Sequence, residues 1–578
     1  MTFRKSLLAS SIVLATLGLT ACGGGSGSDS TPTTPTTPTT PTNTAPTAIA
    51  LNDVQTVKEN TLGATVGTLT ATDADANETF TFTTADTRFV IQGSSLKLAA
   101  TTQLNFEIEP TVKVAVKVTD SASNSYSQDV EFNVTDEMDY DFLSHFEEGV
   151  SSVSYNGQIA RHVLIKELYN YIGSDQFKAN AASMTPAQLK AELNKFYKIA
   201  EADYATLWED RLLTIGTTPA AKQATLFAIS NSHKDLSGKI AGNDASGQHK
   251  NWNNGTSFVG WDGLATNTPE GLVEHFFDLL VARAQGTAMT PNGKEVESPY
   301  VTSDGLDLNQ LIQKFLYGAV AFSQGADDYL DAGKGLDAAN TQDGDSSYTK
   351  LEHQWDEGFG YFGAARNYLS YSDEELAGKG GRDGWKAGYQ DLDADGKIDF
   401  NAEYNFGNST NAAKRDLGAA AHDATMDLTK EAFEAFFAGR KLINSTTAEL
   451  TAAQKTELEG YATTARIAWE KSIVGTVIHY INDTRADLEE MKAGDYDSAK
   501  FETLAKHWSE MKGFALNLQF NPVSPLSATD FAKVQQLMGI KPVLGNAAEI
   551  EAYRVQLLEA RNVLQAAYGF NDAVAANW

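Results

Sequence analysis

The chain has 578 residues and a formal net charge of −30, from 45 Lys and Arg against 75 Asp and Glu. This length predicts two or three domains, and the negative charge argues against nucleic-acid binding and suits a surface that meets divalent cations. The single cysteine excludes an intrachain disulfide framework and a cysteine-rich zinc site.

Residues 1–22 have the pattern of a secretory signal, in which Arg4 and Lys5 precede a short apolar run that ends in LTAC. The segment resembles the signal of bacterial lipoproteins, which implies cleavage before Cys22 and lipidation of Cys22. Because residue 23 is Gly rather than Asp, the resemblance further implies the outer membrane, at the cell surface or on the periplasmic face. No later apolar stretch is long enough to span a bilayer, so we expect the protein to contact the membrane only through its lipid.

Residues 23–45 are rich in Gly and Ser and then repeat Thr-Pro. Such a composition cannot bury enough apolar surface to fold, and it predicts an extended stalk. A stalk of about twenty residues at about 3.1 Å each holds the next domain roughly 60 Å from the lipid.

Residues 46–138 alternate apolar and polar side chains and are rich in Val, Thr and Phe, as in TVKVAVKVTD and QDVEFNVTD. Several short runs with this period of two predict a small all-β antiparallel sandwich. The motifs VKEN, TATDADAN, LNFE and VKVTDSASNS resemble those of a cadherin-like repeat.

In cadherin-like repeats, acids at the two ends of the sandwich bind calcium between successive repeats. The resemblance implies one group at each end: Asp73, Asp75 and Asp120 at the first, and Glu59, Glu107 and Asp136 at the second. The chain departs from the family in having Asn105 where an Asp is usual, and in having a single repeat. The alternative is a sandwich with acidic loops that hold no ion.

Residues 139–578 carry apolar side chains at helical spacing, as where Val474, Val477 and Ile478 share a stripe with Ile481. The glycines and prolines of FAGRK, AYGFND and GIKPVLG predict helix ends. Many long helices without a strand pattern predict a large all-α domain of one or two helical bundles.

The segment KLEHQWDEGFGYFG, if helical, places His353, Asp356 and Glu357 on one face. Imidazole and carboxylates in this arrangement can hold zinc or iron, with His422 and His507 as further candidates. The alternative is that His353 is a hydrogen-bonded core residue beside a packing run of Gly and aromatic side chains.

HQWDEGFGYFGAARNY, together with four later motifs that extend to the C-terminus, resembles the bacterial domain-of-unknown-function 4856 family. This resemblance covers most of residues 140–578 and implies architecture without an established activity. EHQWDEG is also distantly similar to the GxHxxE motif of imelysin-type proteins, which are linked to iron uptake, although Glu352 and Asp356 depart from that motif.

The segment DLDADGKIDFNAE predicts a calcium loop. Asp391, Asp393 and Asp395 match positions 1, 3 and 5 of an EF-hand loop, and Gly396 matches the sharp turn at position 6. The Lys397 carbonyl and Asp399 match positions 7 and 9, whereas position 12 is Ala402 and the acid follows at Glu403. We therefore expect a looser DxDxDG loop with a structural role, and the alternative is a solvated acidic turn.

These features favour a non-enzymatic calcium-binding surface lipoprotein, engaged in adhesion or in binding a protein or another surface ligand. A metal-acquisition component of the imelysin type, with zinc or iron, is the second hypothesis. A hydrolase is the third, although the chain has no HExxH, GxSxG, Walker or Rossmann motif.

Overall fold

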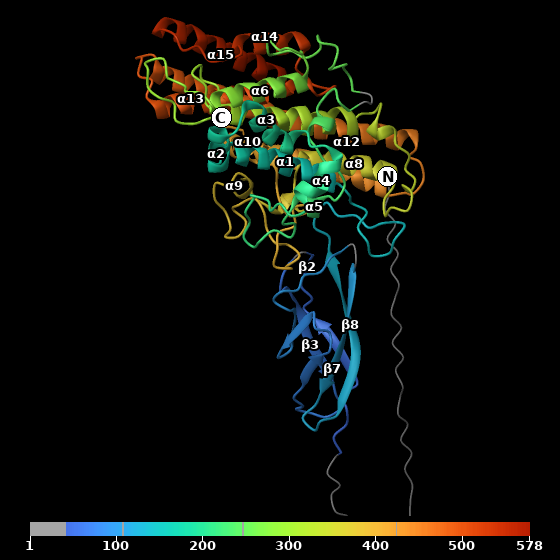
Figure 1. Cartoon of the computed structure of the whole chain (residues 1–578). Helices are drawn as coiled ribbons and strands as arrows, with labels where there is room; N and C mark the ends of the chain where they lie inside the picture. The colour runs from blue at the N-terminus through green and yellow to red at the C-terminus, as the bar shows by residue number, and fades with distance from the viewer. Residues whose placement is uncertain (1–41, 60, 107–108, 245–247, 424) are drawn as a thin grey trace, which may run out of the picture.

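The computed structural model describes residues 42–578, except residues 60, 107–108, 245–247 and 424. A small β unit is followed by a large helical unit (Figure 1), so the expected fold class is confirmed. The predicted signal peptide, Cys22 and residues 23–41 of the stalk lie outside the described residues. Among the described residues, no helix combines the length and the apolar character needed to cross a membrane.

The β unit consists of two four-stranded sheets, with strand orders β1-β3-β6-β5 and β2-β8-β7-β4. Strands pair antiparallel except β2, which runs parallel to β8. On β7, Val112, Val114, Val116 and Val118 point into the core and alternate with exposed residues. The strands are β1 (Ala48–Asn52), β2 (Val57–Lys58), β3 (Thr65–Thr72), β4 (Thr81–Thr84), β5 (Phe89–Gln92), β6 (Ser95–Leu98), β7 (Thr111–Thr119) and β8 (Ser125–Thr135).

The helical unit holds sixteen α-helices within its described residues. The first eight are α1 (Asn156–Ile172), α2 (Asp175–Ser183), α3 (Pro186–Tyr197), α4 (Glu201–Trp208), α5 (Leu226–Ile229), α6 (Pro269–Ala284), α7 (Leu308–Leu316) and α8 (Lys350–Phe362). The others are α9 (Asp373–Leu376), α10 (Gly407–Ala419), α11 (Leu428–Asn444), α12 (Ala452–Met491), α13 (Ser498–Ala515), α14 (Ala528–Met538), α15 (Ala547–Tyr568) and α16 (Asp572–Asn577).

The 40-residue helix α12 is the central helix of this unit, and α10, α11, α13 and α15 all pack against it. Thr451 and Gln454 form a capping box at its start, which satisfies backbone N–H groups that the helix itself cannot bond. The predicted stripe from Val474 to Ile481 is fully buried, because α12 is covered on several sides.

Helix ends at Gly569 and Gly539 are as predicted, and both glycines have positive φ. The predicted end at FAGRK is wrong, since α11 continues through Gly439 to Asn444. A Cβ on Gly439 would lie 2.0 Å from Cζ2 of Trp355. This glycine therefore permits α11 to approach α8 closely.

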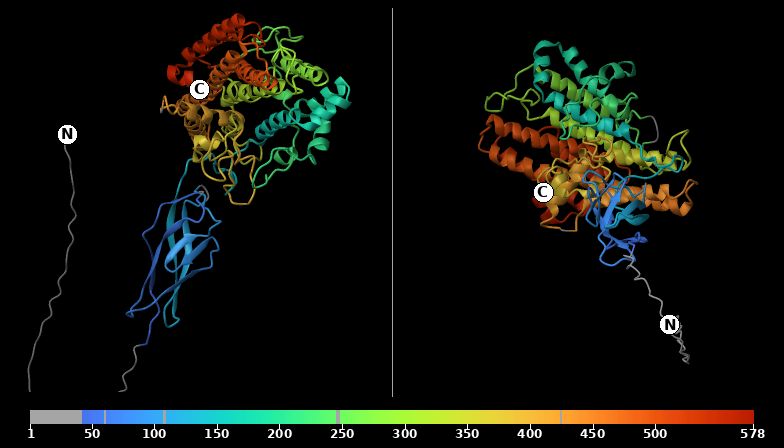
Figure 2. Two further views of the ribbon diagram at one scale, coloured as in Figure 1. Left: turned by 90° about the vertical axis from the view of Figure 1, so that its left-hand side faces the viewer. Right: turned by 90° about the horizontal axis from the view of Figure 1, so that it is seen from below.

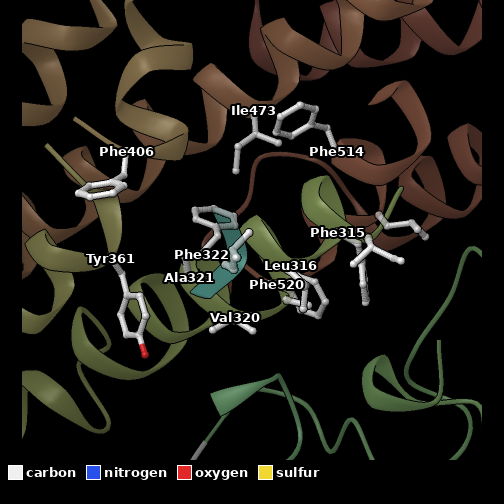
Figure 3. Close-up of a cluster of buried hydrophobic side chains, with 14 of the residues drawn as sticks. Phe315, Leu316, Val320, Ala321, Phe322, Tyr361, Phe406, Ile473, Phe514 and Phe520 are labelled. Carbon is white, nitrogen blue, oxygen red and sulfur yellow. The ribbon is translucent and has the colours of Figure 1, made fainter. Parts of the chain in front are cut away.

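After α7, the helical chain changes character at Tyr317, where α7 gives way to the π-helical turns η2 (Tyr317–Phe322) and η3 (Gly325–Tyr329). The Lys314 carbonyl accepts a hydrogen bond from the side-chain amide of Asn517 at 2.8 Å. Gly318 packs directly on the same Asn517 side chain. Figure 3 shows the wide turns at the centre of an apolar cluster that includes Phe322, Ile473 and Phe514.

The helical unit lies at one end of the sandwich, and β1 begins at the other end (Figures 1 and 2). Glu59 and Glu137 flank the junction, where the Glu59 carboxylate accepts the N–H groups of Phe106 at 2.7 Å and of Glu137 at 2.8 Å. Lys58 pairs with Glu137 at 2.5 Å. The chain therefore enters the β unit far from the helices and leaves it beside them.

Candidate functional site

The loop from Asp391 to Glu403 gathers the predicted calcium ligands. Carboxylate oxygens of Asp391, Asp393 and Asp395 lie within 4.8 Å of one another, and they form the only such group of three or more acids, histidines or cysteines in the described part of the chain. Gly396 has φ +81° and donates its N–H to Asp391 at 3.0 Å. A left-handed glycine that closes the loop onto its first acid is the turn that this kind of calcium loop requires.

The carboxylate of Glu403 holds the loop closed from inside. It is buried, and it accepts the N–H groups of Leu392 at 2.6 Å, Asp393 at 3.3 Å and Asp399 at 2.7 Å. Burial raises the pKa of Glu403 to about 7. The acid that falls one place late in the motif thus orders the backbone around the site.

The charge of Asp391 is disfavoured both by its burial and by the neighbouring acids. Burial raises the pKa of Asp391, and the nearby charges of Asp393 and Asp395 raise it further. A divalent cation among these oxygens would relieve the repulsion, and calcium prefers six to eight oxygen ligands. The Lys397 carbonyl and the Asp399 carboxylate are the remaining predicted calcium ligands. The Asp399 carboxylate also accepts a hydrogen bond from Nε2 of Gln223 at 2.7 Å.

Lys222 is a part of this site that sequence reasoning missed. Its Nζ lies 3.2 Å from Asp395, 3.7 Å from Asp399 and 3.8 Å from Asp393. Burial opposes its charge, but the carboxylates outweigh burial and raise the pKa of Lys222. A bridge between Ala221 and Ile398 brings the two segments together, and no local pattern around Lys222 could have indicated it.

The predicted calcium loop borders a cavity of about 480 Å³ at the junction of the two units. Residues from the β unit and from the helical unit line it: Gln103, Leu104, Asn105, Asp139, Asp141, Arg366, Asn367, Leu392, Asp393, Asp399, Asn401, Ala402 and Glu403. Most of the polar side chains that line the cavity carry oxygen atoms. The buried side-chain oxygens of Gln103 and Asn401 have no hydrogen-bond partner in the described part of the chain. The loop is therefore placed to affect how the two units meet.

The acids predicted for the first end of the sandwich lie where the chain enters it. Asp73 and Asp75 follow β3, and Asp120 follows β7. Asp75 accepts the N–H of Thr44 at 2.7 Å, and the buried Asp120 accepts the N–H of Asn124 at 2.8 Å. Within the described residues these acids do not form a group with ligand atoms within 4.8 Å of one another.

At the second end, Glu59 and Asp136 lie beside the helical unit. Glu59 is buried and bonded to backbone N–H groups, whereas Asp136 is exposed after β8. Glu107 is outside the described residues. The helical unit, rather than a second repeat, is the neighbour at this end.

The side chains of His353, Asp356 and Glu357, predicted to share one helix face, have different surroundings in the structure. Asp356 is fully buried and accepts Nε of Arg440 at 2.8 Å and the hydroxyl of Tyr140 at 2.9 Å. His353 stacks on Tyr348 and bonds through Nδ1 to the Ser154 carbonyl at 3.1 Å. The three side chains therefore form no metal group, because the fold commits Asp356 to an internal ion pair.

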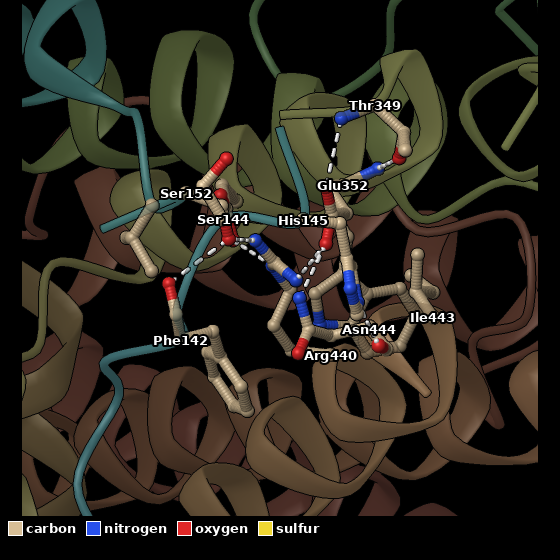
Figure 4. A network of polar contacts seen from close by, with 12 residues as sticks. Phe142, Ser144, His145, Ser152, Thr349, Glu352, Arg440, Ile443 and Asn444 are labelled. Carbon is tan, nitrogen blue, oxygen red and sulfur yellow. Dashed lines mark hydrogen bonds and ion pairs between the residues drawn. The ribbon is translucent and has the colours of Figure 1, made fainter. Parts of the chain in front are cut away.

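Figure 4 shows the polar network that contains this region. Arg440 is fully buried on α11 and donates from Nη1 to Glu352 at 2.7 Å and from Nη2 to Ser152 at 2.6 Å. Asn444 also donates to Glu352, at 2.8 Å. EHQWDEG thus supplies two carboxylates for one buried guanidinium, which is a structural role.

The other histidines proposed as partners lie elsewhere. His507 pairs through Nδ1 with Asp487 at 2.8 Å, and His422 is exposed in the turn after α10. Neither joins His353 in a cluster with metal-ligand spacing within the described residues.

One family model matches the chain, and its description is a domain of unknown function, DUF4856. The match covers residues 138–374, which begin at the junction and end within α9. This supports the expected resemblance for the first part of the helical unit, and the later motifs lie beyond the matched range. No curated protein matches the chain, and no solved structure matches it.

Proposed function

We propose that this protein is a lipid-anchored surface protein of the outer membrane in which calcium at the Asp391–Glu403 loop fixes the helical unit on its β unit. The observation that carries the proposal is the convergence of the Asp391, Asp393 and Asp395 oxygens within 4.8 Å. The stalk and the cadherin-like β unit would then hold the helical unit away from the membrane, where it binds its ligand or partner.

The position of the loop supports a structural role for the ion. Leu392, Asp393, Asp399 and Glu403 line the junction cavity together with residues of the β unit. A cation that draws the acids together would fix this surface of the helical unit, and it would stiffen the joint. Calcium suits the task because its oxygen ligands and flexible geometry accommodate carboxylates and a backbone carbonyl.

The first experiment is calorimetry on the mature chain with and without calcium. We expect calcium to raise the melting temperature of the native chain, and Asp391→Asn with Asp395→Asn to abolish the rise. The matched control is Asp383→Asn with Asp210→Asn, two exposed acids outside the loop, which should keep the full rise. An equal rise in the loop double variant would refute the calcium site.

The second experiment tests the anchor and the surface location. Metabolic labelling with a radioactive fatty acid should mark the native chain and not Cys22→Ala, and protease added to intact cells should cleave the native chain. Full protection of the chain in intact cells, with cleavage after the outer membrane is opened, would exclude the cell surface and leave the periplasmic face.

A further inference from the structure

A second cavity, here termed the lysine cavity, lies within the helical unit and was not anticipated from the sequence. Its volume is about 320 Å³, at the lower end of the range of small-molecule sites. It is lined by residues from α1, α7, α10, α12 and α13 and from the segments beside them: His162, Lys166, Lys314, Tyr317, Leu376, Ala377, Gly378, Ala387, Tyr404, Asn405, Phe406, Gly407, Thr410, Asn411, Lys414, Tyr480, Glu510 and Phe514.

The charge of this lining is opposite in sign to that of the whole chain. Lys166, Lys314 and Lys414 face a single acid, Glu510, and burial lowers the pKa of His162 to about 4, so that the imidazole is neutral. Three positive charges against one negative charge leave an excess of two in a chain with a net charge of −30. A local excess of this kind needs a physical reason, because partly buried ammonium groups repel one another.

Two of the lysines have no partner for their ammonium groups among the residues that the structure describes. Lys314 lies 3.6 Å from Glu510 and donates to Gln313 at 2.6 Å. The side chains of Lys166 and Lys414 are half-buried, and within the described residues neither ammonium group has a hydrogen bond or an ion pair. Burial lowers the pKa of both groups. Buried charges are normally paired, and these two are available to a ligand.

Aromatic side chains supply the other wall of the lysine cavity. Tyr317, Tyr404, Phe406, Tyr480 and Phe514 line it. Tyr317 is also the first residue of the π-helical turn η2, and π-helical turns occur frequently at functional sites. The cavity therefore combines ammonium donors with an apolar surface, which is the composition of a site for an organic anion.

We propose that the lysine cavity binds a small organic molecule with two negative charges, a dicarboxylate or a phosphate monoester. Its anionic groups pair with Lys166 and Lys414, and its carbon body packs on the aromatic wall. The two added charges balance the excess of the lining, with Lys314 remaining paired to Glu510. This names a ligand class for the helical unit, and the cavity requires neither calcium nor the lipid anchor in order to bind it.

The test is isothermal titration calorimetry of the full mature chain with four probes: succinate, inorganic phosphate, acetate and neutral succinamide. Saturable binding of succinate or phosphate is expected, with succinamide and acetate at least roughly tenfold weaker. A preference for succinate would favour the dicarboxylate class, and a preference for phosphate would favour the phosphate monoester class. Absence of saturable binding by both dianions, or equal binding of succinamide, would overturn the proposal.

Variants locate the binding. Lys166→Met with Lys414→Met should weaken dianion binding roughly tenfold or more, whereas Lys430→Met with Lys455→Met removes two exposed lysines and should leave the affinity unchanged. Glu510→Gln adds to the positive excess and should strengthen binding, which a purely structural defect would not do. Equal affinity in the native chain and the Lys166/Lys414 variant would place the ligand elsewhere and refute the site.

Each titration is run once with calcium and once with a chelator. Loss of dianion binding in both conditions, with the calcium-dependent rise in melting temperature intact, would overturn only the lysine cavity. Dianion binding without any calcium effect would overturn only the calcium loop.

Discussion

Arg440 donates from Nε to Oδ1 of Asp356 over 2.8 Å, and both side chains are fully shielded from solvent. The two residues are 84 positions apart and join α11 to α8. Because the same guanidinium also binds Glu352 and Ser152, the most unusual motif of the sequence is part of the internal framework. This relationship gives Glu352 and Asp356, two of the three acids of EHQWDEG, an internal partner.

Removing the guanidinium should strongly destabilise the helical unit. Arg440→Met leaves Glu352 and Asp356 buried without their cation, and breaking a buried pair in this way costs about 3–5 kcal/mol. The measurement is the free energy of unfolding from denaturant titration. Lys441→Met, the exposed neighbour on the same helix, should change it by less than about 0.5 kcal/mol. A loss below about 1 kcal/mol for Arg440→Met would contradict the framework role.

Replacing glycine with alanine should have opposite effects on stability at two positions, because Gly439 lies in the close contact between α11 and α8 and Gly460 does not. Gly439→Ala places a Cβ 2.0 Å from Trp355, and overpacking of this kind costs about 1–3 kcal/mol. Gly460→Ala adds a methyl group in open space on the exposed side of α12 and should stabilise by about 0.5–1 kcal/mol. Thermal unfolding of both variants tests the pair, and a stable Gly439→Ala would argue against the tight helix contact.

We expect Lys222 to compete with calcium for the same carboxylates. Its Nζ lies within 3.8 Å of three acids of the loop, so the ammonium must leave when the ion enters. Lys222→Met should strengthen calcium binding roughly three- to tenfold, as measured by titration calorimetry. Lys397→Met removes an exposed ammonium from the loop and keeps the carbonyl ligand, and it should have a smaller effect. Weaker calcium binding in Lys222→Met would contradict the competition.

Calcium and the dianion should influence each other. The predicted calcium loop runs directly into residues 404–407, which form part of the wall of the lysine cavity. Tyr404 also stacks on Tyr389, with 5.4 Å between the ring centroids. Ordering of the loop by calcium should therefore strengthen succinate binding by about fivefold, and succinate should strengthen calcium binding by the same factor. Asp391→Asn with Asp395→Asn should abolish the calcium effect and keep the affinity measured in chelator.

Dianion affinity should fall as the pH rises through about 8. Burial, with the charges of Lys314, Arg415 and Lys379, lowers the pKa of Lys414 to about 8, against the opposing charge of Glu510. The ammonium is therefore mostly charged at pH 7 and mostly neutral at pH 9. Because only the charged form attracts the dianion, we expect roughly tenfold weaker succinate binding at pH 9 than at pH 7.

The sign of the proton linkage gives a further check. Binding of the dianion raises the pKa of Lys414, so protons are taken up when succinate binds near pH 8.5. Titrations in buffers with different ionisation enthalpies measure this uptake. Lys414→Met should reduce both the uptake and the pH dependence, whereas an affinity that stays constant from pH 7 to pH 9 would contradict the role of Lys414.

Several features followed from local sequence alone. The period of two in TVKVAVKVTD predicted β7, and the buried stripe from Val474 to Ile481 was set by helical spacing. In the predicted calcium loop, the spacing of the acids and of Gly396 decides how the backbone turns, because the N–H groups of Leu392, Gly396 and Asp399 bond to carboxylates of the same thirteen residues. Short-range geometry of this kind depends on the order of residues and little on what surrounds them.

Only the tertiary structure decided the roles of residues with distant partners. His353, Asp356 and Glu357 share helical spacing, but Arg440 comes from another helix and takes Asp356 into the interior. Gly439 was predicted to end a helix, but it lies within α11, where the absence of a side chain leaves room for Trp355. Lys166, Lys314 and Lys414 lie on three separate helices and become a cation cluster only where those helices meet. The sequence thus determined which chemical groups each segment carries, and packing between distant segments determined which groups are paired and which are left for a ligand.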